Sequence, residues 1–221
     1  MVAGLEDPRF GQFDPELGIW IRVTPGASYQ SKAALFLDRD GVVIEDTGYL
    51  CRPVEIVLIP GAVELIAAAN RAGVPVVEVT NQSGIGRGYY GWEEFQAVEQ
   101  ALALKLEQNA AAIDAVIACP YHPEGVAPWA HPMHPARKPQ PGMLLAAQQR
   151  LGLDLSRSWI VGDKPDDLLA GYHAGLRGGM HVLTGQGQVH RPAITAWHPQ
   201  GFEVWLANRL SDAAGLLELL K

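Results

Sequence analysis

Two carboxylates follow a hydrophobic run near the start of the chain. The segment AALFLDRDGVV, residues 33–43, places Asp38 and Asp40 one residue apart. Side chains two positions apart in an extended segment point the same way, so both carboxylates can face one bound ligand. A catalytic site is one interpretation of this pair, and a buried strand that ends in a solvated acidic turn is the other.

Further polar residues in the sequence could join this pair. Three carboxylates in one crevice, those of Asp38, Asp40 and Asp163, repel each other unless a cation offsets them. Oxygen ligands with open positions suit Mg²⁺, which keeps water and substrate phosphate as its remaining ligands. The sequence also contains residues that could donate hydrogen bonds to a phosphoryl group, namely Thr80, Arg137, Lys138 and Lys164. A hard cation, carboxylates and lysines together indicate phosphoryl transfer.

The elements that must position these residues alternate between strand and helix. We expect strands at 33–37, 74–79, 114–118 and 159–162, with weaker candidates near His181 and Phe202. We expect helices at 61–72, 92–109, 141–151, 166–174 and 212–220. This alternation predicts an α/β fold with a Rossmann-like, doubly wound, mostly parallel sheet and helices on both faces. Ligands of such sheets bind at the carboxyl ends of the strands, where Asp38, Thr80 and Asp163 stand.

The connections and the termini set the expected domain organisation. We expect an N-terminal extension over residues 1–31, which lies over the surface, and one domain over residues 32–221. The connection from Asp40 to Gly61 is short, so we expect no large cap domain.

Composition limits the class of partner. The chain has 221 residues, 48% of them hydrophobic, and a formal net charge of −7. An acidic chain is not expected to bind nucleic acid or an anionic membrane. No apolar run reaches the roughly 18 residues that span a bilayer, and residues 1–14 do not resemble a secretory signal. Two cysteines are too few for a disulfide framework, so we expect a protein of the reducing cytoplasm. We also expect a monomer whose partner is a small phosphate ester.

Four motifs together resemble those of the haloacid dehalogenase-like phosphatases. They are DRDGV at 38–42, TNQSGIGRG at 80–88, RKPQPGM at 137–143 and VGDKPDD at 161–167. DTGYL at 46–50 and the Cys-Pro-x-His-Pro run at 119–123 are similar to a group within that superfamily that acts on sugar bisphosphates. The resemblance covers residues 33–185 and implies the fold already expected from the strand and helix pattern.

The resemblance implies a role for each matched residue. Asp38 would be the nucleophile and form an aspartyl-phosphate, and Asp40 would be the general acid and base. Mg²⁺ would rest on Asp38, on the backbone carbonyl of Asp40 and on Asp163. Thr80 and Lys138 would hold the transferring phosphoryl group, with Arg137 beside them. The implied substrate contacts are Asp46, Thr47, Gly48, Tyr49, Asn81, Gln82, Ser83 and Lys164.

The loop from 119 to 136 departs from the resembled pattern. In those phosphatases the corresponding loop holds a structural zinc through Cys-x-His and Cys-x-Cys. Here Tyr121 stands at the histidine position, and His134 and Ala136 stand at the two later cysteine positions. The residues that could still bind zinc are Cys119, His122, His131 and His134. A zinc site of altered geometry and a proline-stiffened loop with solvated histidines are both open interpretations.

The expected function is therefore a Mg²⁺-dependent phosphatase acting on a sugar phosphate, with D-glycero-D-manno-heptose 1,7-bisphosphate as the substrate that the resemblance implies. Two alternatives remain at this point. One is a phosphatase for another small ester, such as histidinol phosphate. The other is a phosphosugar-binding regulator that has kept the fold and lost the chemistry.

Overall fold

The computed structural model describes residues 11–220 and contains an eight-stranded sheet in the order β1-β2-β5-β4-β3-β6-β7-β8. The strands are β1 (Gln12–Asp14), β2 (Ile19–Val23), β3 (Leu35–Leu37), β4 (Val76–Asn81), β5 (Ala115–Cys119), β6 (Trp159–Gly162), β7 (Gly178–His181) and β8 (Glu203–Leu206). The six neighbouring strands β5, β4, β3, β6, β7 and β8 pair in parallel. Strands β1 and β2 are antiparallel additions beside β5. The predicted α/β, mostly parallel sheet is confirmed.

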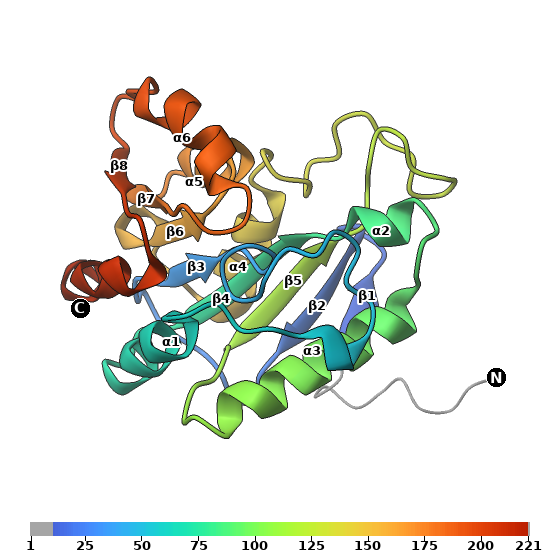
Figure 1. Ribbon diagram of the computed structural model, residues 1–221, viewed down its shortest axis with the longest axis horizontal. Coiled ribbons are helices and arrows are strands. Elements are labelled where there is room, and N and C mark those ends of the chain that lie inside the picture. Colours follow the sequence, from blue (N-terminus) through green and yellow to red (C-terminus); the bar gives the residue numbers. More distant parts are fainter. Residues whose placement is uncertain (1–10, 221) are drawn as a thin grey trace.

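The helices cover both faces of this sheet (Figure 1). They are α1 (Ala62–Arg71), α2 (Ser83–Gly86), α3 (Trp92–Glu107), α4 (Gly142–Leu151), α5 (Pro165–His173), α6 (Gly187–Thr195) and α7 (Leu216–Leu219). Short 3₁₀ helices occupy Pro53–Glu55, Leu155–Arg157 and Leu210–Gly215. The predicted helices at 61–72, 92–109, 141–151 and 166–174 match α1, α3, α4 and α5 within a few residues. The predicted closing helix at 212–220 is a 3₁₀ helix followed by α7.

Alternation along the strands divides the hydrophobic core into two layers. On β3, Leu35 and Leu37 pack with α1 and α3 on one face, and Phe36 packs with α4 and α5 on the other. This period of two is the pattern of a sheet buried on both sides. Because β3 lies in the middle of the sheet, the residues that follow it emerge between two neighbouring strands rather than at an exposed margin.

The N-terminal segment differs from the expected surface extension. Ile19, Trp20 and Ile21 are buried in β2, which pairs with β5 from Trp20 to Val23. Three consecutive buried apolar residues and the pairing with both β1 and β5 make this segment a strand inside the sheet instead of a cover. The division at residue 31 stays a prediction, and residues 1–10 lie outside the described part of the chain. No helix in the described part is long and apolar enough to cross a membrane.

Candidate active site

Asp38 follows β3 directly and meets a lysine from a distant loop. Lys138 Nζ lies 2.8 Å from Asp38 Oδ1 and 2.6 Å from Asp167 Oδ1, and all three side chains are buried. The backbone N–H of Arg39 also donates to Asp38 Oδ1. A buried ammonium between two carboxylates offsets charge that burial would otherwise make costly. Asp38 is therefore held in a fixed position with its charge compensated.

The lysine is fixed by backbone contacts as well as by charge. Lys138 Nζ donates to the carbonyl of Val79 at 2.7 Å. Asn81, at the end of β4, accepts from the backbone N–H of Lys138 and donates to its carbonyl. This reciprocal amide contact ties the loop before α4 to the carboxyl end of β4. Asn81, which was expected to contact substrate, therefore also positions the lysine.

Asp163 arrives at the same place from the end of β6. Its Oδ2 accepts from the backbone N–H of Gln186 at 2.7 Å, and its backbone carbonyl accepts from the ring of the buried His181. A Cβ on Gly41, which has a φ of +92°, would lie 2.5 Å from Asp163 Oδ2, and a Cβ on Gly185 would also collide with that oxygen. Only glycines let the two loops approach the carboxylate this closely.

One oxygen of this carboxylate is left for a ligand. Asp163 Oδ1 is buried and has no hydrogen-bond partner among the described residues. Ligand oxygens of Asp38, Asp163 and Asp167 lie within 4.8 Å of one another. Buried polar atoms are almost always paired, so an orphan carboxylate oxygen beside two further carboxylates fits a bound cation. The donor set is all oxygen, which suits Mg²⁺ and not a thiol-seeking metal.

Burial and neighbouring charges shift the pKa values of Asp163, Asp167 and Lys138. Burial, followed by the charges of Asp38 and Asp167, raises the pKa of Asp163 to about 7. Burial raises the pKa of Asp167 to about 6, with the charge of Lys138 opposing it. For Lys138, burial lowers the pKa, but Asp167 and Asp38 outweigh burial and raise the pKa above its usual value. The lysine is therefore always charged, and the carboxylates compete for protons until a cation joins them.

Asp40 is held by a separate buried network. Arg39 donates from Nε and Nη2 to the two oxygens of Asp40 at 3.2 and 3.1 Å, and Gln82 donates to Oδ2 at 3.1 Å. Arg39 is itself buried, with Nη1 3.0 Å from Glu99 of α3. The Asp-Arg-Asp sequence at the end of β3 thus splits its side chains. Asp38 and Asp40 face the pocket, and Arg39 turns into the core to hold the second carboxylate.

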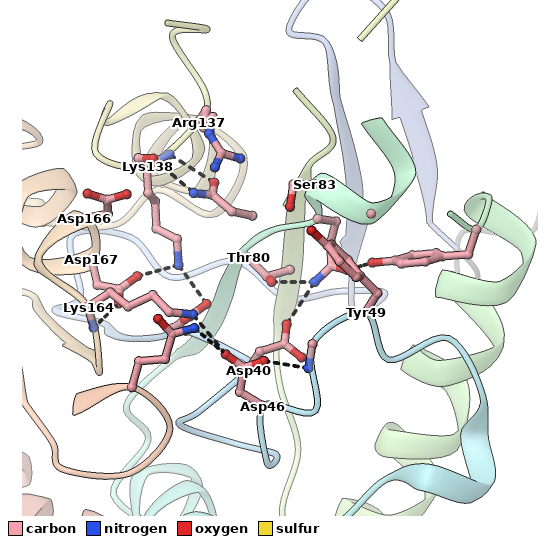
Figure 2. Close-up of a pocket in the computed structure, with 17 residues that line it drawn as sticks. Asp40, Asp46, Tyr49, Thr80, Ser83, Arg137, Lys138, Lys164, Asp166 and Asp167 are labelled. Carbon is pink, nitrogen blue, oxygen red and sulfur yellow. Dashed lines mark hydrogen bonds and ion pairs between the residues drawn. The ribbon is translucent and has the colours of Figure 1, made fainter. Parts of the chain in front are cut away.

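These residues surround one pocket of about 350 Å³. Figure 2 shows Lys138 and Asp167 on one side, Tyr49 on the other, and Thr80 and Asp40 between them. The lining residues are Asp38, Asp40, Asp46, Gly48, Tyr49, Thr80, Asn81, Gln82, Ser83, Gly84, Tyr90, Arg137, Lys138, Lys164, Asp166, Asp167 and Gln186. The Thr80 hydroxyl oxygen accepts from Gln82 at 2.8 Å, so its proton remains free for a ligand.

Most residues expected from the sequence line this pocket; the exceptions are Asp163, which is buried beside Asp38, and Thr47. Thr47 is exposed and does not line the pocket. Its neighbour Asp46 does, and its carboxylate accepts from Lys164 at 3.3 Å and from the side chain of Gln186 at 3.1 Å. Lys164 lines the pocket and is paired with Asp46, and its contact with substrate stays a prediction. Arg137 lines the pocket and donates to the carbonyl of Tyr121 at 2.9 Å.

Several residues of the site were not expected from the sequence. Asp167 is at the third position of α5, where its carboxylate accepts from the backbone N–H of Lys164. The repeated acidic residues of VGDKPDD carried that signal. Gln186 precedes α6, a helix that the sequence analysis did not predict. Tyr90 donates to Gln82 and so supports the residue that contacts Asp40.

Two interpretations of the loop at 119–136 were open, a zinc site of altered geometry and a loop without zinc. Each of its three histidines accepts a backbone N–H two residues ahead at Nδ1: His122 from Glu124, His131 from Met133 and His134 from Ala136. Within residues 11–220 no three Cys, His, Asp or Glu side chains of this loop come close enough to share an ion. Burial raises the pKa of the Cys119 thiol to about 12, so the thiol is protonated at neutral pH when no metal is bound.

The sequence and the structure are both similar to known phosphatases. A family model described as HAD-hydrolase-like matches residues 135–212. A D-glycero-beta-D-manno-heptose-1,7-bisphosphate 7-phosphatase from Mesorhizobium japonicum is 53% identical over 168 residues, 76% of this chain and 77% of that protein. The enzyme of the same name from Escherichia coli K12 is 33% identical over 183 residues, 83% of this chain and 92% of that protein.

Two solved structures share the fold along most of the chain. An HAD-like phosphatase from Mesorhizobium loti superposes with a TM-score of 0.83 at 45% identity, and the match covers 94% of this chain and 95% of that one. A D,D-heptose 1,7-bisphosphate phosphatase from B. bronchiseptica, in complex with magnesium and phosphate, gives a TM-score of 0.72 at 32% identity, with coverage of 84% and 98%. The described pocket thus lies in a fold whose relatives are phosphatases.

Proposed function

The chain belongs to the haloacid dehalogenase-like phosphatases, and we propose that it removes the 7-phosphate from D-glycero-D-manno-heptose 1,7-bisphosphate in a Mg²⁺-dependent reaction. The observation that carries the proposal is the placement of Asp38 in the pocket. It lies 2.8 Å from Lys138 Nζ and beside Asp163, whose Oδ1 has no partner in the described part of the chain. A cation and an ammonium around one carboxylate would let it approach a phosphate dianion.

In the first half of the proposed reaction, one oxygen of Asp38 attacks phosphorus. The new oxygen–phosphorus bond forms as the bond to the sugar oxygen breaks, and Asp40 gives its proton to that departing oxygen. Lys138 and the Thr80 hydroxyl hold the oxygens of the phosphoryl group in transit. Arg39 and Gln82 keep Asp40 aimed at the pocket, since they hold its carboxylate from behind.

In the second half, Asp40 takes a proton from a water molecule, and the hydroxide oxygen that results attacks phosphorus. The bond to Asp38 breaks, which releases inorganic phosphate and restores the free carboxylate. Asp38, Asp163 and the backbone carbonyl of Asp40 would hold Mg²⁺, which supplies charge stabilisation for the phosphoryl oxygens when bound. Asp167 is tied to Lys138 at 2.6 Å, so its role here is to hold the lysine.

The proposed substrate carries a second phosphate, and we infer that Arg137 binds it. Lys138 is buried against carboxylates and Lys164 is paired with Asp46. Among the described residues the Arg137 guanidinium makes one hydrogen bond, to the carbonyl of Tyr121, and Arg137 lines the pocket. A planar guanidinium can bind a phosphate through two parallel hydrogen bonds.

Arg137→Ala is expected to lower kcat/KM for the bisphosphate much more than kcat/KM for a monophosphate. A hydrogen bond to a charged group is worth about 1.5–3 kcal/mol, so kcat/KM for heptose 1,7-bisphosphate should fall roughly 10- to 100-fold. An aryl phosphate has no second phosphate, and its kcat/KM should change by less than about threefold. Steady-state kinetics on both substrates checks this. Equal losses would show that Arg137 acts on the phosphoryl group being transferred, and not on the remainder of the substrate.

Stabilisation by Mg²⁺ is expected to grow as pH rises from 5 toward 8. Without a cation, the pKa of Asp163 is raised to about 7, so the folded protein retains a proton that the unfolded chain loses near pH 4. The contribution of this carboxyl group to the free energy of unfolding of the cation-free protein therefore falls as pH rises from about 4 to 7. Mg²⁺ must displace the proton, so its binding strengthens over the same range.

Thermal unfolding with and without Mg²⁺ measures this effect at each pH. The increase in Tm caused by Mg²⁺ should be small near pH 5 and largest above pH 7. Asp163→Asn is the control, and it should show little Mg²⁺ effect at any pH. An Mg²⁺ effect that does not change between pH 5 and 8 would contradict the assignment of Asp163 as a metal ligand.

Purified protein with Mg²⁺ and a panel of phosphate esters tests the substrate. Heptose 1,7-bisphosphate should have the highest kcat/KM, above heptose 7-phosphate, histidinol phosphate and an aryl phosphate, and vanadate should inhibit every turnover. A higher value for histidinol phosphate would replace the proposed substrate and keep the phosphatase. Binding of the bisphosphate with no release of phosphate would favour the regulator. The proposed enzyme acts as a monomer in the cytoplasm.

A further inference from the structure

The β1–β2 hairpin, residues 12–23, contacts the loop that in the resembled phosphatases binds zinc. Gly18 lies at its turn with a φ of +66°. A Cβ on Gly18 would lie 2.9 Å from the Tyr121 ring and 3.0 Å from His134 Nε2. Phe13 of β1 meets the Trp129 ring edge-on, with 5.3 Å between ring centroids. The hairpin therefore packs on the loop at both ends of the segment 121–134.

The rings of the loop stack where metal ligands would be expected. Tyr121 and His134 occupy two of the positions at which the resembled loops carry ligands. Their rings stack at 3.7 Å with an angle of 5° between the planes. His131 lies edge-on to His134 at 5.2 Å, and Trp129 edge-on to Tyr121 at 5.4 Å. Aromatic contacts of this kind add stabilisation beyond the burial of their surface.

The hairpin is itself held in place by contacts with the rest of the domain. Asp14 accepts from the backbone N–H groups of Glu16 and Leu17, and its other oxygen lies 2.6 Å from Arg150 of α4. Trp20 is buried and packs edge-on against Phe95 of α3 at 5.1 Å. These contacts tie the hairpin to helices on both faces of the sheet.

The clamped loop leads directly into the active site. Arg137 donates from its side chain to the carbonyl of Tyr121 and from its backbone to the carbonyl of His134, both at 2.9 Å. The two stacked residues therefore present the two carbonyls that orient Arg137. Movement of the stack would displace the guanidinium from the pocket.

We propose that the β1–β2 hairpin replaces the structural zinc of the resembled phosphatases: it clamps the loop at 120–136 through the Tyr121–His134 stack and thereby positions Arg137 without a metal ion. The clamp is a property of the folded chain alone, whereas its effect on substrate selection rests on the proposed function. Arg137 contacts substrate in that account, and Gly18 and Tyr121 act through it as positioning residues.

Gly18→Ala and Gly26→Ala form a matched pair that tests the clamp. Both glycines have positive φ, so alanine costs a similar backbone strain of about 1–2 kcal/mol at either site. A Cβ on Gly26 meets nothing within 4 Å, whereas a Cβ on Gly18 collides with the stack. Hydrogen exchange of the amides of Val126, Trp129 and His131, which are bonded within or beside the loop, reports on the loop directly.

Gly18→Ala is expected to speed exchange of these amides about tenfold or more, and Gly26→Ala to leave them unchanged. Protein grown with added zinc should hold well below one zinc per chain after dialysis, and a zinc-specific chelator should not alter exchange. If Gly18→Ala does not fold, Phe13→Leu removes the contact of the hairpin with Trp129 and should also speed exchange. Unchanged exchange in the folded variant, or one bound zinc whose removal speeds exchange, would overturn the clamp.

Substrate kinetics separates positioning from a loss of stability. Well below Tm, Gly18→Ala should raise KM for the bisphosphate several-fold and leave KM for an aryl phosphate unchanged, because Arg137 meets only the second phosphate. Equal changes in both KM values would refute the link from the stack to Arg137. If the bisphosphate is no substrate at all, the proposed function fails, and the exchange and zinc measurements still decide on the clamp.

Discussion

Asp38→Asn is expected to lower kcat by about 10⁴-fold or more, because loss of a covalent nucleophile removes the only route through the aspartyl-phosphate. Asparagine has nearly the same shape, and its amide oxygen can still accept from the backbone N–H of Arg39, as Asp38 does. Lys138 keeps its contact with Asp167. One carboxylate fewer in a crowded site also relieves repulsion, so Tm should stay the same or rise.

Initial rates on heptose 1,7-bisphosphate, with Tm measured on the same preparation, check this prediction. Asp166→Asn is the matched control, since Asp166 lines the same pocket and has no assigned chemistry. Its kcat should stay within tenfold of the wild-type value. A rate above a few per cent of wild type in Asp38→Asn would rule out Asp38 as the nucleophile, provided that mass spectrometry excludes deamidation of the new asparagine.

Lys138→Met is expected to damage both activity and stability. Its ammonium lies between Asp38 and Asp167 with both carboxylates buried. Removal of one partner from a buried ion pair costs about 3–5 kcal/mol in the free energy of unfolding. Loss of a charged donor to the phosphoryl group should lower kcat about 10³-fold as well.

The pH dependence distinguishes this cause from a packing defect. Without the ammonium, which opposes the effect of burial, the folded-state pKa of Asp167 rises further above its unfolded value. The loss of stability is then largest above pH 7 and shrinks as pH falls and this carboxyl group takes up a proton. Lys164→Met is the control, because that lysine is partly exposed and its pair with Asp46 is worth about 1 kcal/mol or less. Urea unfolding at pH 5.5 and pH 8 measures both variants, and a loss independent of pH would contradict the account.

The residues that end parallel strands were the part of the site most accessible from the sequence. Asp38, Thr80 and Asp163 each follow a β-branched or aliphatic run, and parallel strands bring their carboxyl ends to one edge. Local pattern was therefore enough to bring them together. Lys138 follows no strand, so its residue type suggested a phosphoryl donor, and only the resemblance of its motif gave it a definite role beside Thr80.

Other features depend on contacts between distant segments, which no local pattern carries. The apolar run Ile19-Trp20-Ile21 was visible, but its flanking prolines and glycines resemble a surface segment. Its burial as β2 depends on pairing with β5, more than ninety residues away. The stack of Tyr121 on His134 likewise joins two loop positions and a turn at Gly18. Periodicity predicts which face of an element is buried, and not which distant loop packs on it.

The position of the phosphate that is removed tests the central claim most directly. Phosphorus-31 NMR can follow heptose 1,7-bisphosphate with the protein and Mg²⁺, since the signals of the anomeric and the primary phosphate are separate. We expect the primary 7-phosphate signal to disappear as inorganic phosphate appears, while the anomeric phosphate persists, and chelation of Mg²⁺ to stop the change. Release of the anomeric phosphate first, or no release of phosphate in the presence of Mg²⁺, would contradict the account.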